Sequence, residues 1–477
     1  MSVAKGSPTK DFFVDILTKD IHLNDAILDL LDNCLDGVVR IKGSQNKWED
    51  KEYYKGYCAE INITNDSFSI KDNCGGIPRE VAEEYAFRMG RTPTTGSNLP
   101  TVGIYGIGMK RAIFKMGKDA LIETKNDSKI YSVHISEDWS LSTDWDFPIE
   151  DLASNDELVD EGTIVTIIKL NSEISSLWSS AERIENFVEN LNVAIKQSYS
   201  LIIQKGFCIK INGTAIEALP IELLISTSES GIKPYIFKKT FGDVNVQLAI
   251  GFYAPPPSEE DIDDGNELKR SSADAGWTIV CNDRVVLYND KTYLSGWGEA
   301  GVPSYHTQFI GIRGIVTFES NNPQELPMTT TKRGINLSSP IYAAVKDRMR
   351  EGLKLFINYT NIWKGRIQME RSQHSTKTER VPFAKILENN TEFQASHGLK
   401  FASSSGGMIF KPVLPKPPSD KNYRIIRYTK PTEDIKILSE YFFNDESLEI
   451  SASIIGEKCF DTVFELACKK LRGSSCE

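Results

Sequence analysis

The segment AILDLLDNCLDGVVR (26–40) combines an apolar helical pattern with polar side chains on one face. Asp29, Asn33 and Asp36 follow the spacing i, i+4, i+7, which places them on one side of a helix. Solvent-exposed charges are the simple interpretation of such residues. Two carboxylates and an amide within a helix of Leu, Ile, Val and Cys also suit a site, and the neighbouring segments decide between the two.

Two glycine-rich segments follow this helix. DNCGGIP (72–78) comes directly after the strand-like FSI, so it predicts a tight turn with exposed backbone N–H groups and a fixed carboxylate, Asp72. In VGIYGIGMKRAIF (102–114), glycines precede a helix, where a phosphate can approach backbone amides and the positive end of the dipole. The chain has neither a P-loop nor the G-x-G-x-x-G order. Each segment alone could be a surface turn or a flexible loop.

The overall composition indicates a soluble globular protein. The 477 residues are enough for two or three domains. We expect a cytoplasmic protein without membrane contact, because no apolar run is long enough to span a bilayer and the N-terminus has no signal-peptide core. The eight cysteines form no C-x-x-C pair, which argues against a zinc site. The net charge of -11 argues against an extensive nucleic-acid-binding surface.

Four motifs in order carry a resemblance to a known superfamily. LDLLDNCLDG, DNCGGIP, GIYGIGMK and GTIVTI (162–167) resemble the boxes of the GHKL ATPases, closest to the MORC-like and heat-shock-chaperone-like branch, and the second glycine box is most similar to that of the MORC proteins. The resemblance covers about residues 10–365. It implies an α+β protein with a Bergerat-fold α/β sandwich ATPase head, an α/β transducer domain and a small C-terminal module. The implied cofactors are ATP and Mg²⁺.

The resemblance also assigns roles to single residues. Asn33 would bind Mg²⁺ through its side-chain oxygen, and Asp72 would accept a hydrogen bond from the adenine amino group. Asp29 stands where the family has the glutamate that acts as general base; it is one methylene, about 1.5 Å, shorter, so we expect slow hydrolysis. Cys74 replaces a family glycine, and residues 88–102 would form the ATP lid. The residues expected to bind the nucleotide are Asn33, Asp36, Asp72, Gly76, Gly103, Tyr105, Gly106, Ile107, Gly108, Met109, Lys110 and Thr163.

A second catalytic group is expected from QELPMTTTKRGI (324–335), which precedes a long helical pattern. This segment resembles the transducer loop that presents a cation to the γ-phosphate. Lys332 is the first candidate and Arg333 the second, because a positive group there would stabilise charge developing on the transferred phosphoryl. A surface loop with two basic residues is the alternative interpretation.

We expect four regions: the ATP-binding domain at 1–220, the transducer-like domain at 221–366, a basic Ser/Gly/Pro-rich linker at 367–422 and a small module at 423–477. Residues 364–436 contain 14 basic and 7 acidic residues. The resemblance implies an ATP-dependent homodimer that acts as a conformational clamp. Its client could be nucleic acid, in a MORC-like or antiviral defence role. The alternative is a chaperone-like or signalling ATPase that gates an effector protein without binding nucleic acid.

Overall fold

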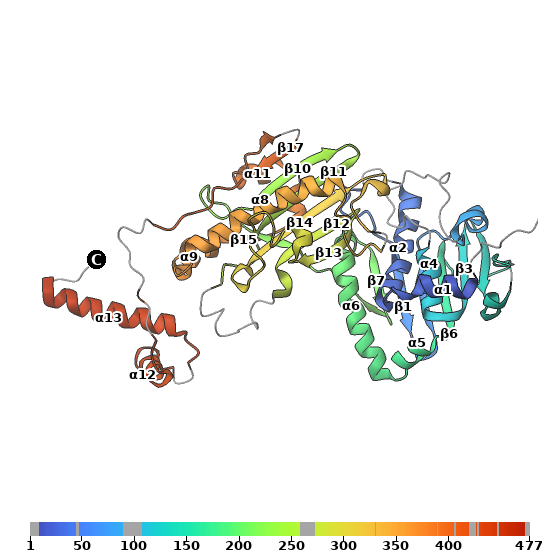
Figure 1. The fold of residues 1–477 in the computed structure, drawn as a ribbon, viewed down its shortest axis with the longest axis horizontal. Coiled ribbons are helices and arrows are strands. Elements are labelled where there is room, and N and C mark those ends of the chain that lie inside the picture. Colours follow the sequence, from blue (N-terminus) through green and yellow to red (C-terminus); the bar gives the residue numbers. More distant parts are fainter. Residues whose placement is uncertain are drawn as a thin grey trace, which may run out of the picture.

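The computed structural model describes residues 9–43, 47–88, 107–142, 144–257, 272–329, 331–388, 390–404, 407–418, 426, 429–445 and 448–472. Two large sheets, each with helices packed against it, lie side by side, and a helix pair lies beyond the second sheet (Figure 1). The expected α+β class with an α/β sandwich head is confirmed.

The first sheet has eight strands in the order β5-β4-β3-β6-β2-β1-β7-β8. All neighbours are antiparallel except β1 and β7, which are parallel. The strands are β1 (Cys58–Ile63), β2 (Phe68–Asp72), β3 (Gly117–Asn126), β4 (Lys129–Ile135), β5 (Ile149–Leu152), β6 (Gly162–Leu170), β7 (Cys208–Ile211) and β8 (Thr214–Ala215).

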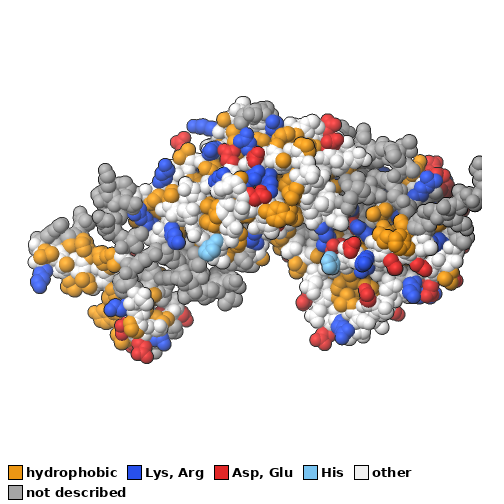
Figure 2. Space-filling model, in the orientation of Figure 1, with side chains coloured by type: hydrophobic (Ala, Val, Ile, Leu, Met, Phe, Trp, Pro, Cys, Tyr) orange, Lys and Arg blue, Asp and Glu red, His pale blue; other side chains and the backbone are white. Residues whose placement is uncertain are grey.

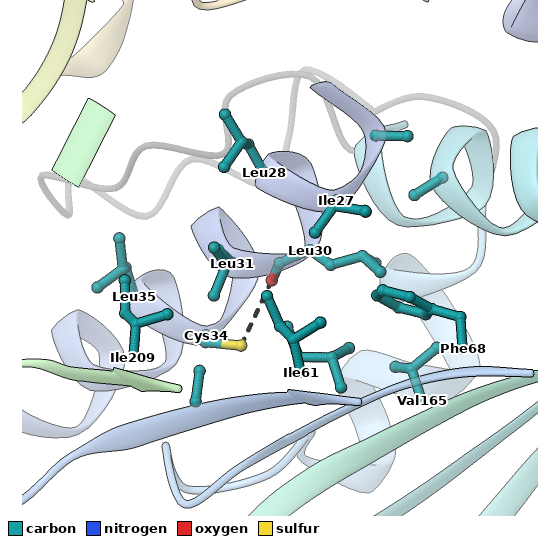
Figure 3. Close-up of a cluster of buried hydrophobic side chains, with 14 of the residues drawn as sticks. Ile27, Leu28, Leu30, Leu31, Cys34, Leu35, Ile61, Phe68, Val165 and Ile209 are labelled. Atoms are coloured by element: carbon teal, nitrogen blue, oxygen red, sulfur yellow. Dashed lines mark hydrogen bonds between the residues drawn. The ribbon is translucent and has the colours of Figure 1, made fainter. Parts of the chain in front are cut away.

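Helix α2 (Leu23–Lys42) packs its apolar side on this sheet. Figure 3 shows Ile27, Leu30, Leu31 and Leu35 pointing towards strand residues such as Ile61. The helix ends at Gly43, whose φ of 72° is easy for glycine and whose N–H donates to the Val39 carbonyl. The other helices of this region are α1 (Lys10–Lys19), α3 (Arg79–Val81), a π-helical turn (Ala82–Ala86), α4 (Gly108–Met116), α5 (Ser172–Leu177) and α6 (Ala181–Gln204).

The second sheet has seven strands in the order β13-β12-β14-β11-β10-β17-β16, and its own core. The long helix α8 (Pro340–Trp363) packs on it, starting with Ser339 as N-cap and proline at N1. The strands are β10 (Tyr235–Phe241), β11 (Val244–Phe252), β12 (Gly276–Cys281), β13 (Arg284–Asp290), β14 (Ile312–Glu319), β16 (Ala402–Ser404) and β17 (Gly407–Phe410). A separate pair joins β9 (Glu222–Ser226) to β15 (Thr378–Pro382).

The region expected as a linker contains folded elements. Strand β17 pairs with β10, and Phe383, Ile386 and Phe393 are buried in a core shared with the second sheet. The Ser, Gly and Pro content gave no sign of this, because strand pairing between distant segments leaves no local pattern. The domain boundaries themselves stay a prediction. The elements here are α9 (Ile367–Gln373), β15, α10 (Phe383–Leu387), α11 (Thr391–Ser396), β16 and β17.

The C-terminal module consists of α12 (Thr432–Phe443) and α13 (Ala452–Arg472), which contact each other. Both helices carry exposed apolar side chains, including Tyr441, Phe460 and Val463, and Figure 2 shows hydrophobic side chains on this end of the molecule. Among the described helices, none has the length and apolar character that crossing a bilayer requires. Short 3-10 turns occur at Glu137–Leu141, Ser272–Asp274, Tyr293–Ser295, Thr307–Phe309, Pro323–Glu325 and Ser375–Lys377.

Candidate functional site

The polar residues of α2 differ in their exposure. Asp29 is buried, Asp36 is partly exposed and Asn33 is exposed. The side-chain oxygen of Asn33 is therefore accessible to a ligand. Beside Asp29 lies the N-terminus of α4: a Cβ built on Gly108 would lie 3.3 Å from the Asp29 Cβ and Cγ. The carboxylate thus sits at the positive end of a helix dipole, which favours a negative charge.

Two cations face Asp29. The Arg111 guanidinium on α4 donates a hydrogen bond from Nη2 to Oδ2 of Asp29. Lys332, from the loop before α8, has its Nζ 3.8 Å from Oδ1 of the same carboxylate. The structure therefore brings the two residues expected to be catalytic, Asp29 and Lys332, to the same place, although they lie in different sheet regions of the chain.

Asp32 is the buried centre of this region, and the sequence motifs did not single it out. Lys332 Nζ donates to its Oδ2 at 2.7 Å, while Arg284 Nε at 3.1 Å and the Tyr199 hydroxyl at 2.8 Å donate to its Oδ1. Burial pushes the pKa of Asp32 upward, but the positive charges of Lys332 and Arg284 outweigh it and hold that pKa below its usual range. Reciprocally, burial is outweighed by Asp32 and Asp29, and the pKa of Lys332 lies above its usual value.

The turn between β12 and β13 connects the second sheet to the first region. Asn282 and Asp283 both have positive φ, 50° and 68°, as a tight hairpin turn requires. Asp283 accepts a hydrogen bond from Lys205 at 2.9 Å, and the next residue, Arg284, reaches Asp32. The adjacent residues Asp283 and Arg284 therefore each form an ion pair with the first region, Asp283 with Lys205 and Arg284 with Asp32. The only sequence signal is the Asn-Asp turn itself, which does not indicate its partners.

Asp72 ends β2, is partly exposed, and contacts the buried residues Cys34 and Cys74. Its Oδ1 accepts the Cys74 backbone N–H at 2.7 Å, and the Cys34 thiol donates to its Oδ2 at 3.5 Å. Burial raises the pKa of Asp72 above its usual value, against the opposing effect of these hydrogen bonds. The departure at Cys74 also places its own thiol beside the carboxylate, and burial together with the Asp72 charge raises the pKa of that thiol.

Two glycines allow the backbone to pack closely beside Asp72. Gly76 has a φ of 62°, and a Cβ there would overlap the Lys125 carbonyl. A Cβ on Gly162 would likewise overlap the Asp72 backbone carbonyl. The hydroxyl of Thr163, the next residue, lies 3.1 Å from that of Thr124. Gly76 and Gly162 are both buried, so the position that a Cβ would take at each is already filled by neighbouring backbone.

The remaining expected residues lie at the start of α4 or outside the described part. Ile107, Gly108 and Met109 are partly exposed, whereas Lys110 is buried and donates from Nζ to the Ala86 carbonyl at 2.8 Å. Gly103, Tyr105 and Gly106 lie outside the described residues, as does the expected lid at 88–102 except for its first residue.

Residues 21–164 match the model of the family described as Histidine kinase-, DNA gyrase B-, and HSP90-like ATPase. The matched segment is therefore similar to GHKL-type ATPase domains; it contains α2, the Asp72 turn and α4 and ends just after Thr163. The comparison with curated proteins finds no match. The donor set fits the implied ligands, because Asn33 offers a hard oxygen of the kind that Mg²⁺ prefers and the partly exposed Asp72 offers a carboxylate that can accept a hydrogen bond from an amino group.

Proposed function

We propose that this GHKL-type domain binds ATP with Mg²⁺ and hydrolyses it slowly, and that the second region completes the catalytic site. The observation that supports this most strongly is the meeting of Asp29, the N-terminus of α4 and Lys332. A carboxylate, a helix dipole and a lysine from another domain are the groups that phosphoryl transfer to water requires: a proton acceptor and positive charge.

Each end of the proposed site has a separate task. Asp72 accepts a hydrogen bond from the exocyclic amino group of adenine, which guanine lacks at that position. By the family resemblance, the base packs against the backbone at Gly76. At the other end, the exposed amide oxygen of Asn33 is the protein ligand of the metal, and backbone N–H groups in the first turn of α4 bind phosphate.

Mg·ATP, when bound, supplies a phosphoryl group activated for attack by water. Asp29 orients that water and accepts its proton, since a buried carboxylate at this position has an oxygen available. Lys332 stabilises the negative charge that develops. It is held ready for this by Asp32, which keeps the ammonium within 3.8 Å of Asp29.

The test is phosphate release by the purified full chain with Mg·ATP. We expect steady hydrolysis by the wild type and its loss in Asp29→Asn, with ATP-analogue binding retained. Asp66→Asn, in an exposed turn of the same domain, is the matched control and should leave the rate unchanged. Hydrolysis by Asp29→Asn at the wild-type rate would remove Asp29 from the mechanism.

The wider role remains our earlier hypothesis of an ATP-dependent homodimer that works as a clamp, with a MORC-like or antiviral defence role among the possibilities. Part of the basic region is engaged in the fold: Arg371 donates to the Pro256 carbonyl, and Lys411 pairs with Glu351 at 3.3 Å. Truncation would therefore remove packed structure.

Charge substitutions at exposed positions such as Lys377 and Arg380 are the cleaner test of nucleic-acid binding. DNA affinity that falls steeply with salt and with these substitutions would support a nucleic-acid client. No affinity at low salt would favour an effector protein.

A further inference from the structure

We propose that Arg111 is a positioning residue for Asp29, and this inference rests on the proposed ATPase function. The two oxygens of the Asp29 carboxylate have different surroundings. Oδ2 accepts a hydrogen bond from Arg111, whereas Oδ1 accepts none from any residue in the described ranges. Lys332 lies 3.8 Å from Oδ1, beyond hydrogen-bonding distance, because its ammonium donates to Asp32 at 2.7 Å.

The position of Arg111 follows from its place on α4. It lies in the first turn, three residues after Gly108, and its backbone N–H donates to the Ile107 carbonyl at 2.9 Å. Helical side chains of this length point back towards the N-terminus of their helix. Because Gly108 has no side chain, the space between Arg111 and Asp29 is open, and the guanidinium reaches the carboxylate.

The pair is largely removed from solvent. The Asp29 side chain is 5% exposed and that of Arg111 is 14% exposed. The Nε of Arg111 is buried and has no hydrogen-bond partner in the described part of the chain. Asp29 is therefore the group that fixes the guanidinium, and the guanidinium in turn fixes the carboxylate. A charge-assisted contact of this kind is stronger and more directional than one between neutral groups.

The two oxygens of the Asp29 carboxylate therefore have different roles. Arg111 occupies Oδ2, so Oδ1 is the atom left to accept a proton from water, on the side where Lys332 stands. An aspartate is short, and its oxygens must be aimed well to serve at a site where the family has a longer residue. Arg111 orients the Asp29 carboxylate without contacting the reacting atoms.

Three variants on α4 test this role. Arg111→Gln removes the positive charge and the planar guanidinium group, and Arg111→Lys keeps the charge but not the planar group. Lys115→Gln is the control, because Lys115 is a cation on the same helix whose Nζ donates to the Thr18 carbonyl at 3.2 Å, away from Asp29. Each is measured for turnover, for affinity towards a non-hydrolysable ATP analogue, and for urea unfolding without nucleotide.

We expect Arg111→Gln to lower kcat about tenfold or more, in line with the effect of misaligning a general base, while analogue affinity stays within about threefold. Arg111→Lys should recover part of kcat, and Lys115→Gln should match the wild type. In urea, Arg111→Gln combined with Asp29→Asn should lose less stability than the two single changes added together, because the pair is broken only once.

Other results separate this inference from the proposed function. A wild type without ATP hydrolysis would overturn the proposed function itself. A wild type that hydrolyses ATP, with an unchanged kcat in Arg111→Gln, would overturn only the positioning role. A loss of analogue affinity as large as the loss of kcat would also overturn it, and would make Arg111 a phosphate ligand. Strict additivity in urea would show that the contact with Asp29 does not exist in solution.

Discussion

Replacing Asp32 by asparagine should destabilise the nucleotide-free protein strongly. Asp32 is 1% exposed and is the shared acceptor for Arg284 and Lys332, which are themselves buried. Asp32→Asn keeps the shape but removes the negative charge, so two buried cations lose their main counter-charge. Breaking a buried pair in this way costs about 3–5 kcal/mol, and the lower end applies here because Lys332 can still approach Asp29.

The same helix offers a matched control. Asp25, two turns earlier on α2, pairs with Arg333, the neighbour of Lys332, but that pair is more exposed: 17% for Asp25 and 34% for Arg333. An ion pair open to water contributes about 0–1 kcal/mol. Asp25→Asn therefore breaks an ion pair between the same two segments, but one that is more exposed and has one cation where Asp32 has two.

The assay is urea unfolding followed by tryptophan fluorescence, without nucleotide. We expect a loss of about 3 kcal/mol in Asp32→Asn and at most about 1 kcal/mol in Asp25→Asn. Arg284→Gln should lower the free energy of unfolding less in the Asp32→Asn background than in the wild type, because Asp32→Asn has already removed the counter-charge of Arg284. Equal losses in the two single variants, or a loss below about 1 kcal/mol in Asp32→Asn, would refute the reasoning.

Three further outcomes are expected. Asp72→Asn should weaken ATP binding by a few kcal/mol at most and reduce the preference for ATP over GTP, as read by competition binding; an unchanged ATP/GTP ratio removes Asp72 from the base pocket. Lys332→Ala should lower kcat more than analogue affinity in steady-state assays, and equal losses would argue against a transition-state contact. Burial raises the pKa of Glu319 from 4.5 to about 7. The folded state then holds a proton that the unfolded chain has released, so the free energy of unfolding should fall as pH rises from 4.5 to 7. Glu319→Gln should reduce that fall by up to about 3 kcal/mol, and an identical pH profile in urea would contradict the assigned burial.

Local pattern was enough to predict the elements that carry the motifs. The spacing of apolar residues in 26–40 predicts α2, and the glycines before Met109 predict the start of α4. Pairing between distant segments was not predictable in this way. Strand β17 joins β10 across more than 160 residues, and its four residues lie within a Ser-, Gly- and Pro-rich segment that is typical of a linker. Only the shared core shows that it belongs to the second sheet.

In the site, too, residues within local motifs were predictable, and residues defined by distant partners were not. Asp29 and Asp72 lie in contiguous motifs whose composition is unusual enough to notice. Asp32, Arg111 and Arg284 were missed because their roles depend on partners far away in the chain: Arg284 and Asp32 are 252 positions apart, and Arg111 and Asp29 are 82 apart. A buried aspartate next to the expected metal ligand looks like any helical residue until its partners are placed.

Calorimetric titration of the full chain with ATP, with and without Mg²⁺, tests the central claim most directly. We predict saturable, magnesium-dependent binding by the wild type. In Asn33→Ala this binding should be lost or nearly so, while urea unfolding stays within about 0.5 kcal/mol because the side chain is exposed. Heats of titration that are the same in Asn33→Ala as in the wild type, or no binding by the wild type, would contradict the account.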